Sequence, residues 1–163
     1  DRGSALRLMP VAERLRHLLP GLWAGVLLCI AAIAAPAVFA QLDRADAGRV
    51  VGRIFVQEAW LSLALGALLL VIERARARRA AEAGTGSVLS TEMLLVLGAV
   101  FCTVAGYFAL QPMMPAARAG QGPLSFGQLH ALSSAFYAVK VLLLLALAWR
   151  GAGPAELSPL PSS

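Results

Sequence analysis

The chain has 163 residues, a length that suits a single domain. Apolar residues (AVILMFWYC) make up 59% of it and charged residues only 14%, whereas an average soluble protein is about 45–50% apolar, glycine included, and about 25% charged. A soluble fold of this size could not bury so much apolar surface. The composition, with only two cysteines, therefore excludes a disordered chain, a disulfide scaffold and an ordinary soluble enzyme. It indicates an integral membrane protein.

The net charge of +5 comes from 14 basic and 9 acidic residues. On a soluble protein such an excess would suggest a nucleic-acid partner. Here the basic residues lie mostly outside the long apolar runs, where they orient membrane helices and contact anionic headgroups. We therefore expect membrane lipids, and no nucleic acid, as partners.

Four apolar segments follow one another, each close to the roughly 20 residues that a spanning helix needs. They cover residues 18–40, 54–73, 92–111 and 128–149, so the predicted membrane domain is 18–149. A basic segment, 1–17, precedes it, and a tail rich in Pro, Ser and Gly, 150–163, follows it and is expected to be disordered. The runs are continuous rather than alternating, which favours helices over strands. The sequence thus predicts an all-α bundle of four transmembrane helices.

Local signals mark the ends of these segments. Ser90 is a typical N-cap residue before the third segment, and the two prolines that follow Gln111 predict that the third helix ends there. Trp23 and Trp149 lie near segment ends, where tryptophan rings prefer the headgroup level.

Four spans place both termini on one side of the membrane. That side carries nine arginines and the other side four, so the positive-inside rule predicts cytoplasmic termini. Residues 37–40 resemble a signal-peptide cleavage site, but the apolar stretch exceeds the usual 7–15 or so residues, and we expect the span to be retained. Met9 would make a good native start, in which case residues 1–8 are not native and the predicted orientation is unchanged.

Polar residues within the spans are candidate functional groups, because a charge at the bilayer centre costs about 2.5–3.5 kcal/mol on insertion scales. Lys140 lies near the middle of the fourth span. With His130, Ser133 or Ser134, and Tyr137 it recurs at helical spacing, so these residues share one face. No acidic residue is expected at the depth of Lys140. This face could line a path for a proton or solute, or hold the bundle together by hydrogen bonds, and Lys140 could alternatively snorkel to the interface.

Glu58 lies near the outer end of the second span, and His130 lies within roughly one helical turn of the same depth. A cluster of these two residues with nearby glutamines (Gln57, Gln111 and Gln128) at the outer mouth is the predicted site. The alternative is an interfacial network that only satisfies its own members.

Metal and haem sites have little support in the sequence. His17 and His130 fall on opposite sides of the membrane and could not ligate one haem, and no His or Cys pair has the spacing of a zinc site. We expect no metal, no cofactor and no catalytic constellation, and keep a haem at His130 as a lesser alternative. Cys29 is expected to act as a packing residue.

Two rows of small residues predict close helix packing, within the chain or with a partner. They are Gly21 and Gly25 in the first span, and Gly98, Cys102 and Gly106 in the third.

Several short motifs together carry a family resemblance. They are Gly21-Leu-Trp-Ala-Gly25, Pro36-x-x-Phe39, Ala47-Gly-Arg-Val-Val-Gly-Arg-Ile-Phe55 and Phe126-x-x-Leu129-His130-x-x-Ser133. The chain resembles, from Leu18 to Trp149, the bacterial integral-membrane family labelled domain of unknown function 4149, akin to transmembrane protein 205. The resemblance implies a four-helix bundle in the bacterial inner membrane, with no established activity. Distantly similar copper-resistance and haem-binding families use further histidines that this chain does not match.

Three functions are consistent with these features, and we expect the first of them, with the second as the alternative and the third as the lesser alternative. The small-residue faces and short loops favour an accessory or structural subunit that packs against a larger membrane complex, or against a second copy of itself. The intramembrane polar residues favour a small-solute or proton-handling transporter. A haem-binding redox protein is the third.

Overall fold

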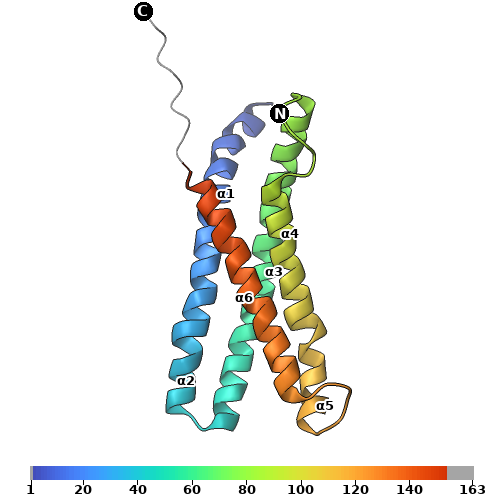
Figure 1. Ribbon diagram of the computed structural model, residues 1–163. Helices are drawn as coiled ribbons and strands as arrows, with labels where there is room; N and C mark the ends of the chain where they lie inside the picture. Colours follow the sequence, from blue (N-terminus) through green and yellow to red (C-terminus); the bar gives the residue numbers. More distant parts are fainter. Residues whose placement is uncertain (1, 154–163) are drawn as a thin grey trace, which may run out of the picture.

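The computed structural model describes residues 2–153, with side chains for residues 11–153, and contains no strand in that range. Four helical rods make up the fold (Figure 1). The first rod joins α1 (Arg2–Cys29), a π-helical turn (Ile30–Ala34) and α2 (Ala35–Gln41), and the second is α3 (Arg44–Glu82). The third joins α4 (Thr91–Thr103), a second π-helical turn (Val104–Ala109), a 3-10 turn (Gln111–Met113) and α5 (Met114–Arg118). The fourth is α6 (Phe126–Gly151).

The rods run alternately up and down and contact one another in a ring. The first rod packs on α3, α3 on α4, α4 on α6, and α6 returns to α1. The start of α1 and the end of α6 lie at the same end of the bundle, at the top of Figure 1, and we call this the terminal end. The opposite end, with the α2–α3 and α5–α6 connections, is the far end. The four-helix prediction is confirmed.

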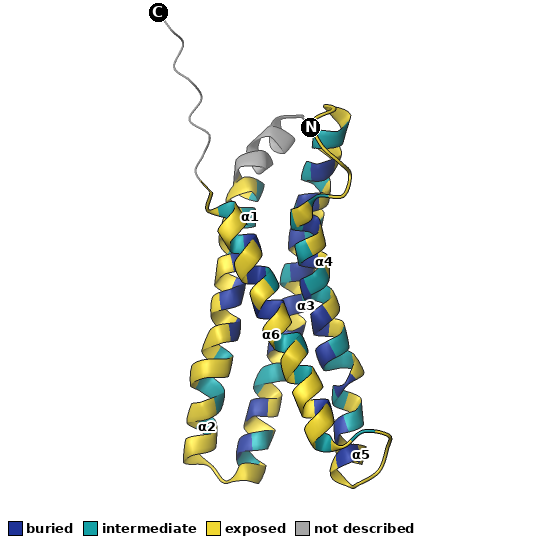
Figure 2. Cartoon of the chain, in the orientation of Figure 1, coloured by how far each residue is buried: buried dark blue, intermediate teal, exposed yellow. Residues whose placement is uncertain are grey.

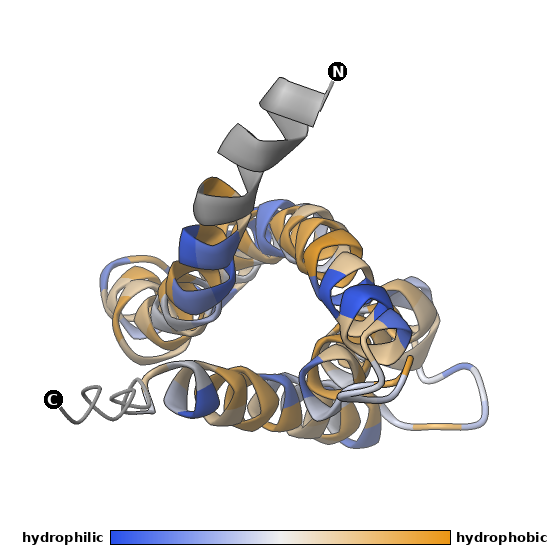
Figure 3. Cartoon of the chain, turned by 90° about the horizontal axis from the view of Figure 1, so that it is seen from above, coloured by the Kyte–Doolittle hydropathy of each residue, from blue (hydrophilic) through white to orange (hydrophobic). Residues whose placement is uncertain are grey.

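The outer surface of the bundle is apolar. All four rods are long and apolar enough to cross a membrane, and large side chains such as Leu22, Val71 and Leu142 point outward with about two-thirds of their surface exposed. Figure 3 shows apolar residues along the rods and hydrophilic ones at the helix ends. Monomeric soluble proteins rarely expose so large a continuous apolar surface to water. The chain is therefore a multi-pass membrane protein.

The terminal half of the bundle has a closely packed core. Trp23, Leu27, Leu69, Val96 and Leu144 are each at most 1% exposed and form one cluster between the rods. A smaller cluster in the far half joins only the third rod to α6. In Figure 2, buried residues lie on the inner faces of the rods and exposed residues lie on the outer faces. Polar side chains lie at the centre of the far half.

A π-helical turn precedes a proline in two of the rods. Pro36 has no N–H, and its ring would clash with the carbonyl of Ala32 in a regular helix. The turn just before it is wider, with the N–H of Ala35 donating to the carbonyl of Ile30, five residues back. Wider turns of this kind relieve such a conflict.

The third rod departs from its predicted end near Gln111. Its α-helix already stops at Thr103, and π-helical, 3-10 and short α-helical turns carry the rod on to Arg118. The prolines therefore change the type of helix without ending the rod. At the other end of the rod the predicted cap is confirmed, since Ser90 Oγ accepts a hydrogen bond from the backbone N–H of Met93 at 3.2 Å.

The helices extend beyond the apolar segments that predicted them. α3 begins at Arg44 rather than at 54, and α1 begins at Arg2. α6 continues to Gly151, so the first residues of the predicted tail 150–163 are helical, while 154–163 and residue 1 lie outside the described residues. Charged residues at these ends still form the backbone hydrogen bonds of a helix. Hydropathy alone therefore does not locate the ends of the helices.

Candidate functional site

A buried ion pair joins α6 to α3 at mid-height in the bundle. Lys140 Nζ lies 2.7 Å from Glu58 Oε1, and both side chains are 3% exposed. Ser62 Oγ donates a hydrogen bond to the same carboxylate oxygen. Trp23 Nε1 in turn donates to Ser62 Oγ at 2.9 Å, which links α1 to the pair. Such a pair is tolerated in a low-dielectric interior when opposite charges and hydrogen bonds compensate each other.

The expectation that no acidic residue lies at the depth of Lys140 is wrong. Glu58 lies 14 positions after Arg44, the first residue of α3, and Lys140 lies 14 positions after Phe126, the first residue of α6. Both helices begin at the far end, so at 1.5 Å per residue the two side chains lie equally deep, roughly 21 Å along their helices. Counting from the edge of the apolar run at 54 placed Glu58 too near the surface.

Trp23 was expected at the headgroup level and is instead part of the core. It is 1% exposed and bonded to Ser62. Trp149, at the end of α6, is 83% exposed. The two tryptophans look alike in the sequence, and only the packing of α1 distinguishes them.

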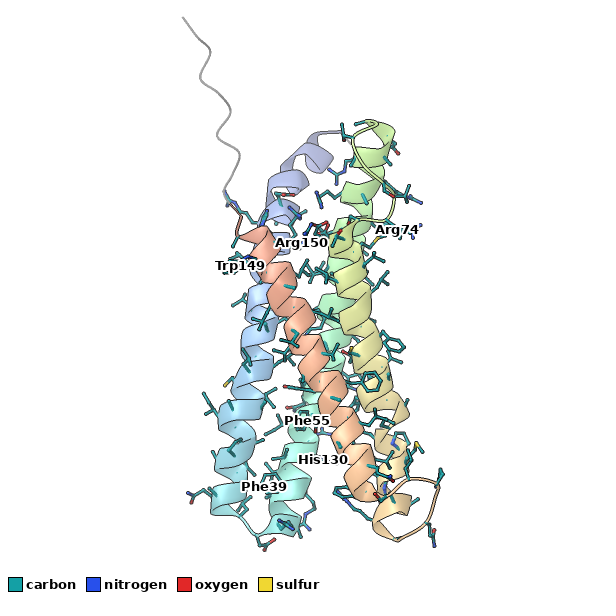
Figure 4. The ribbon with its side chains drawn as sticks, in the orientation of Figure 1. Phe39, Phe55, Arg74, His130, Trp149 and Arg150 are labelled. Atoms are coloured by element: carbon teal, nitrogen blue, oxygen red, sulfur yellow. The ribbon has the colours of Figure 1, made fainter. Side chains whose placement is uncertain are left out.

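A cavity of about 610 Å³ occupies the far half of the bundle, and all four rods line it. Its lining extends from Phe39 and Arg118 near the far end to Glu58 and Lys140. Beyond the ion pair, the core cluster around Trp23 fills the bundle. Figure 4 shows Phe39, Phe55 and His130 in this half. Sites for small organic ligands have volumes of about 300–1,000 Å³, so the cavity can hold such a molecule.

The structure places all six predicted polar residues around this cavity. They are Glu58 on α3 and His130, Ser133, Ser134, Tyr137 and Lys140 on α6. They do not form the predicted single cluster at the mouth, because Glu58 pairs with Lys140. His130 lies nearer the far end, where its ring stacks on Phe126 at 6.0 Å between centroids. Gln111 also lines the cavity, whereas Gln57 and Gln128 are not among its lining residues.

Two hydroxyl groups of α6 bind backbone carbonyls beside the π-helical turns. Tyr137 OH donates to the carbonyl of Leu27 at 2.8 Å, just before the first turn. Ser133 Oγ donates to the carbonyl of Gly106 at 2.8 Å, within the second turn. Such turns occur frequently at functional sites. In this bundle, however, the two hydroxyl groups bind carbonyls of the first and third rods and hold α6 against them. We therefore assign them a structural role.

Other polar groups of the cavity are open to it. Both donors to Glu58 bind Oε1, and no buried side-chain oxygen lacks a partner in the described part of the chain, so Oε2 is accessible from the cavity. Five further lining side chains make no hydrogen bond to any described residue: Tyr107, Gln111, Arg118, His130 and Ser134. Their donor and acceptor groups are free to bind water or a ligand.

At the terminal end, ion pairs connect neighbouring rods. Glu73, 2% exposed, accepts from Arg16 Nε at 3.0 Å and from Arg76 Nε at 3.1 Å. Glu92 pairs with Arg76 at 3.2 Å and with Arg150 at 2.8 Å. These contacts join α1 to α3, α3 to α4, and α4 to α6.

A hydrogen bond from α1 to α6 completes this ring. His17 Nδ1 lies 2.8 Å from the carbonyl oxygen of Gly151. We call the ion pairs and this bond the terminal ring. Sequence reasoning missed it, because it treated the arginines only as signals of orientation. Acidic residues at the ends of two apolar runs, Glu73 and Glu92, were the available signal.

The predicted packing row on the third rod lies against α6. A Cβ added at Gly98 would come within 2.9 Å of Leu143 Cδ1, and one at Gly106 within 2.7 Å of Phe136 Cβ. Cys102 between them is buried and lines the cavity. A small residue is therefore required at Gly106, whereas at Gly98 the added atom would meet only the flexible end of the Leu143 side chain.

The other predicted row does not pack within this chain. A Cβ at Gly21 or Gly25 would meet nothing within 4 Å, because this side of α1 faces outward. Gly66 on α3, which the sequence did not single out, is the close contact of that region, since an added Cβ would collide with Val100. A lone glycine inside a leucine-rich helix carries no spacing signal.

The two histidines lie at opposite ends of the bundle, His17 in the terminal ring and His130 in the cavity. Among the residues that the structure describes, no three His, Cys, Asp or Glu side chains lie together as a metal site would require. Cys29 and Cys102 are both free.

Comparison with known families agrees with the resemblance in the motifs. The model of the family Domain of unknown function (DUF4149) matches residues 18–122, more than half of the chain. The chain belongs to the DUF4149 family. The match includes Trp23, Glu58 and Ser62 and ends before α6, so Lys140 lies outside it. No curated protein and no solved structure matches the chain.

Proposed function

We propose that this DUF4149 protein is a small-solute transporter of the bacterial inner membrane that binds its solute in the far-half cavity. The supporting observation is the Glu58–Lys140 pair at the inner end of the cavity, with one carboxylate oxygen open to it. A buried charge pair is a costly way to hold helices together, since apolar residues of similar volume often serve at least as well. Intramembrane charges that line a cavity are typical of solute and proton pathways.

The two halves of the bundle suit different tasks in such a transporter. The far half provides the binding cavity, and the Glu58 carboxylate there can accept a hydrogen bond or a proton from the solute. The terminal half, with its packed core and terminal ring, closes the route on that side. Release toward the terminal end, which we place in the cytoplasm, requires the terminal ring to open.

Uptake by reconstituted proteoliposomes tests this function. Liposomes that contain the purified protein are incubated with a pool of small metabolites, and their contents are identified by mass spectrometry. We expect one or more solutes to accumulate above the level in empty liposomes, and the accumulation to disappear in Lys140→Met. The matched control is Arg74→Met, which removes an exposed cation at the terminal end, away from the cavity. Contents equal to those of empty liposomes would contradict the proposal.

A second candidate, an accessory subunit of a larger membrane complex, is favoured by the outward-facing Gly21–Gly25 row. Small residues of this type allow close contact between membrane helices. A mild-detergent pull-down from native membranes should then recover a stoichiometric partner that Gly21→Leu releases and Leu22→Ala retains. Recovery of the protein alone would exclude this role.

A further inference from the structure

The chemistry of the cavity indicates which class of solute it would bind, and this step rests on the proposed function. We infer that the solute is an amphipathic anion, with an apolar body and a single carboxylate or phosphate group. Three features of the far half support this inference. They are the net charge of the cavity lining, the cations near the far end, and the apolar wall between Arg118 and the Glu58–Lys140 pair.

The charged side chains of the cavity lining do not balance. Lys140 and Arg118 are cations and Glu58 is the one anion among the described lining residues, which leaves one positive charge when His130 is neutral. The unbalanced charge is that of Arg118, which is exposed at the far end. A ligand with one negative charge would neutralise the cavity, whereas a cation would increase the imbalance.

The surplus cation is held in a defined position near the far end. The Arg118 guanidinium carbon lies 4.7 Å from the centroid of the Phe126 ring, on which the His130 ring also stacks. No described carboxylate pairs with Arg118, so its N–H groups can bind an anionic headgroup. Hydrogen bonds from guanidinium to carboxylate or phosphate are roughly twice as strong as neutral ones.

Charge around the far end has the same sign. With Arg118, three arginines of α3 (Arg44, Arg49 and Arg53) outnumber Asp43 and Asp46 there. A surplus of one sign near an opening raises the local concentration of ligands of the opposite charge.

Between Arg118 and the ion pair, the cavity wall is mainly apolar. Ala35, Phe39, Val51 and Phe55 contribute this part of the lining. An apolar wall with a few fixed polar groups is typical of sites for organic ligands. The body of the anion would lie here, with its charged group at Arg118.

Cys102 provides a reporter of charge preference, because it lines the cavity whereas Cys29 lies on the outer surface. In a Cys29→Ser protein, Cys102 is the single thiol. Its labelling rates with two small methanethiosulfonates are compared, one bearing a sulfonate and one a trimethylammonium, each divided by the rate with free cysteine. We expect the sulfonate reagent to react about tenfold faster, which corresponds to one favourable charge interaction.

Substitutions then locate the origin of this preference. Arg118→Gln should abolish it, and Arg74→Gln, which removes an exposed arginine at the terminal end and outside the cavity lining, should retain it. Equal rates, or a faster cationic reagent, would overturn the anion assignment and leave the cavity as a binding site. Failure of both reagents to reach Cys102 would instead contradict the proposed function. The comparison within the Cys29→Ser protein stands even if Arg118→Gln does not fold.

Protection of Cys102 distinguishes the two sources of such an anion. In phosphatidylcholine bilayers, octanoate should slow labelling and octylammonium should not, which would identify a free acid. Slower labelling in phosphatidylglycerol bilayers without octanoate would identify an anionic lipid headgroup. If neither condition slows labelling, the inferred ligand class is wrong.

Discussion

Lys140 and Glu58 are 82 positions apart in the chain and make a 2.7 Å ion pair because each lies 14 positions from the far-end start of its own helix. The pair marks the boundary between the packed terminal half and the hollow far half. The pair joins α6 to α3, which affects the stability of the bundle, and it also forms the inner end of the cavity that we propose as the binding site. Both consequences can be measured.

Breaking the ion pair should destabilise the bundle more than removing both charges. Lys140→Met leaves a buried carboxylate without its cation, and the loss of one partner of a buried pair typically costs about 3–5 kcal/mol. Glu58→Gln should cost a similar amount, and the double variant less than the sum. Equilibrium unfolding in mixed detergent measures the four proteins.

The exposed pair between Arg49 and Asp46 is the control for this cycle. Pairs at the surface contribute about 0–1 kcal/mol, so Arg49→Met should change the free energy of unfolding by no more than that. Additive effects of Glu58→Gln and Lys140→Met would show that the two side chains do not interact.

The two tryptophans should differ in their sensitivity to substitution. Trp23→Phe removes the 2.9 Å hydrogen bond to Ser62 Oγ, which keeps only the longer 3.5 Å bond from Lys140 Nζ, and this should cost about 1–3 kcal/mol. Trp149→Phe, on an exposed side chain, should remain within about 0.5 kcal/mol. Thermal unfolding of the two variants side by side is the measurement. Equal losses would place Trp23 outside the core.

Glycine-to-alanine substitutions should have opposite signs in the two small-residue rows. Gly106→Ala forces a methyl group against Phe136 Cβ, and overpacking of this kind costs about 1–3 kcal/mol. Gly25→Ala meets no neighbour, and the gain in helix propensity should stabilise the protein by up to about 1 kcal/mol. Destabilisation by Gly25→Ala in detergent, where no partner is present, would contradict the outward position of that row.

The terminal ring should lose stability in the order of the burial of its carboxylates. Glu73→Gln removes the buried partner of Arg16 and Arg76, which keep only the more exposed Glu13 and Glu92, and should cost about 3 kcal/mol. Glu92→Gln, in a more exposed position, should cost about 1 kcal/mol. Glu82→Gln, exposed at the end of α3, is the matched control and should have no measurable effect. The reverse order, read from the denaturation midpoints, would refute the ring as described.

Orientation in the membrane is a separate prediction. The excess of arginine at the terminal end predicts that this end lies in the cytoplasm. In a Cys29→Ser, Cys102→Ser protein, a cysteine introduced at Gly84 should be labelled only after the cells are permeabilised, and one at Gly120 by a membrane-impermeant reagent in intact spheroplasts. The reverse pattern would invert the topology.

Hydropathy was sufficient to predict the number and the helical nature of the spans, because a continuous apolar run of this length has few alternatives. It could not show that α3 begins ten residues before its apolar run, since Arg44, Arg49 and Arg53 are helical and polar at once. The depth of Glu58 was misjudged for that reason. Counting from the N-cap residues Asp43 and Ser125 would have aligned Glu58 with Lys140.

Other features depend on contacts between helices and have no local signature. The terminal ring requires the order of helices around the bundle, which the sequence leaves open. The π-helical turns precede prolines, which are visible in the sequence, and lie beside the hydroxyl groups of Tyr137 and Ser133, whose partners are not. The polar face of α6 was predictable from spacing, but the cavity that it lines was not.

Lys140 is the one lysine of the chain, and this permits a direct test of the ion pair that the account depends on. With ¹⁵N-lysine and ¹³C-labelled glutamate carboxylates, the protein in lipid bilayers gives a single lysine side-chain signal, and solid-state dipolar recoupling reports whether a carboxylate carbon lies beside it. We predict strong dephasing of the Nζ signal in the native protein and its loss in Glu58→Gln. An Nζ signal without dephasing in the native protein would show that Glu58 and Lys140 are apart, and would contradict the account.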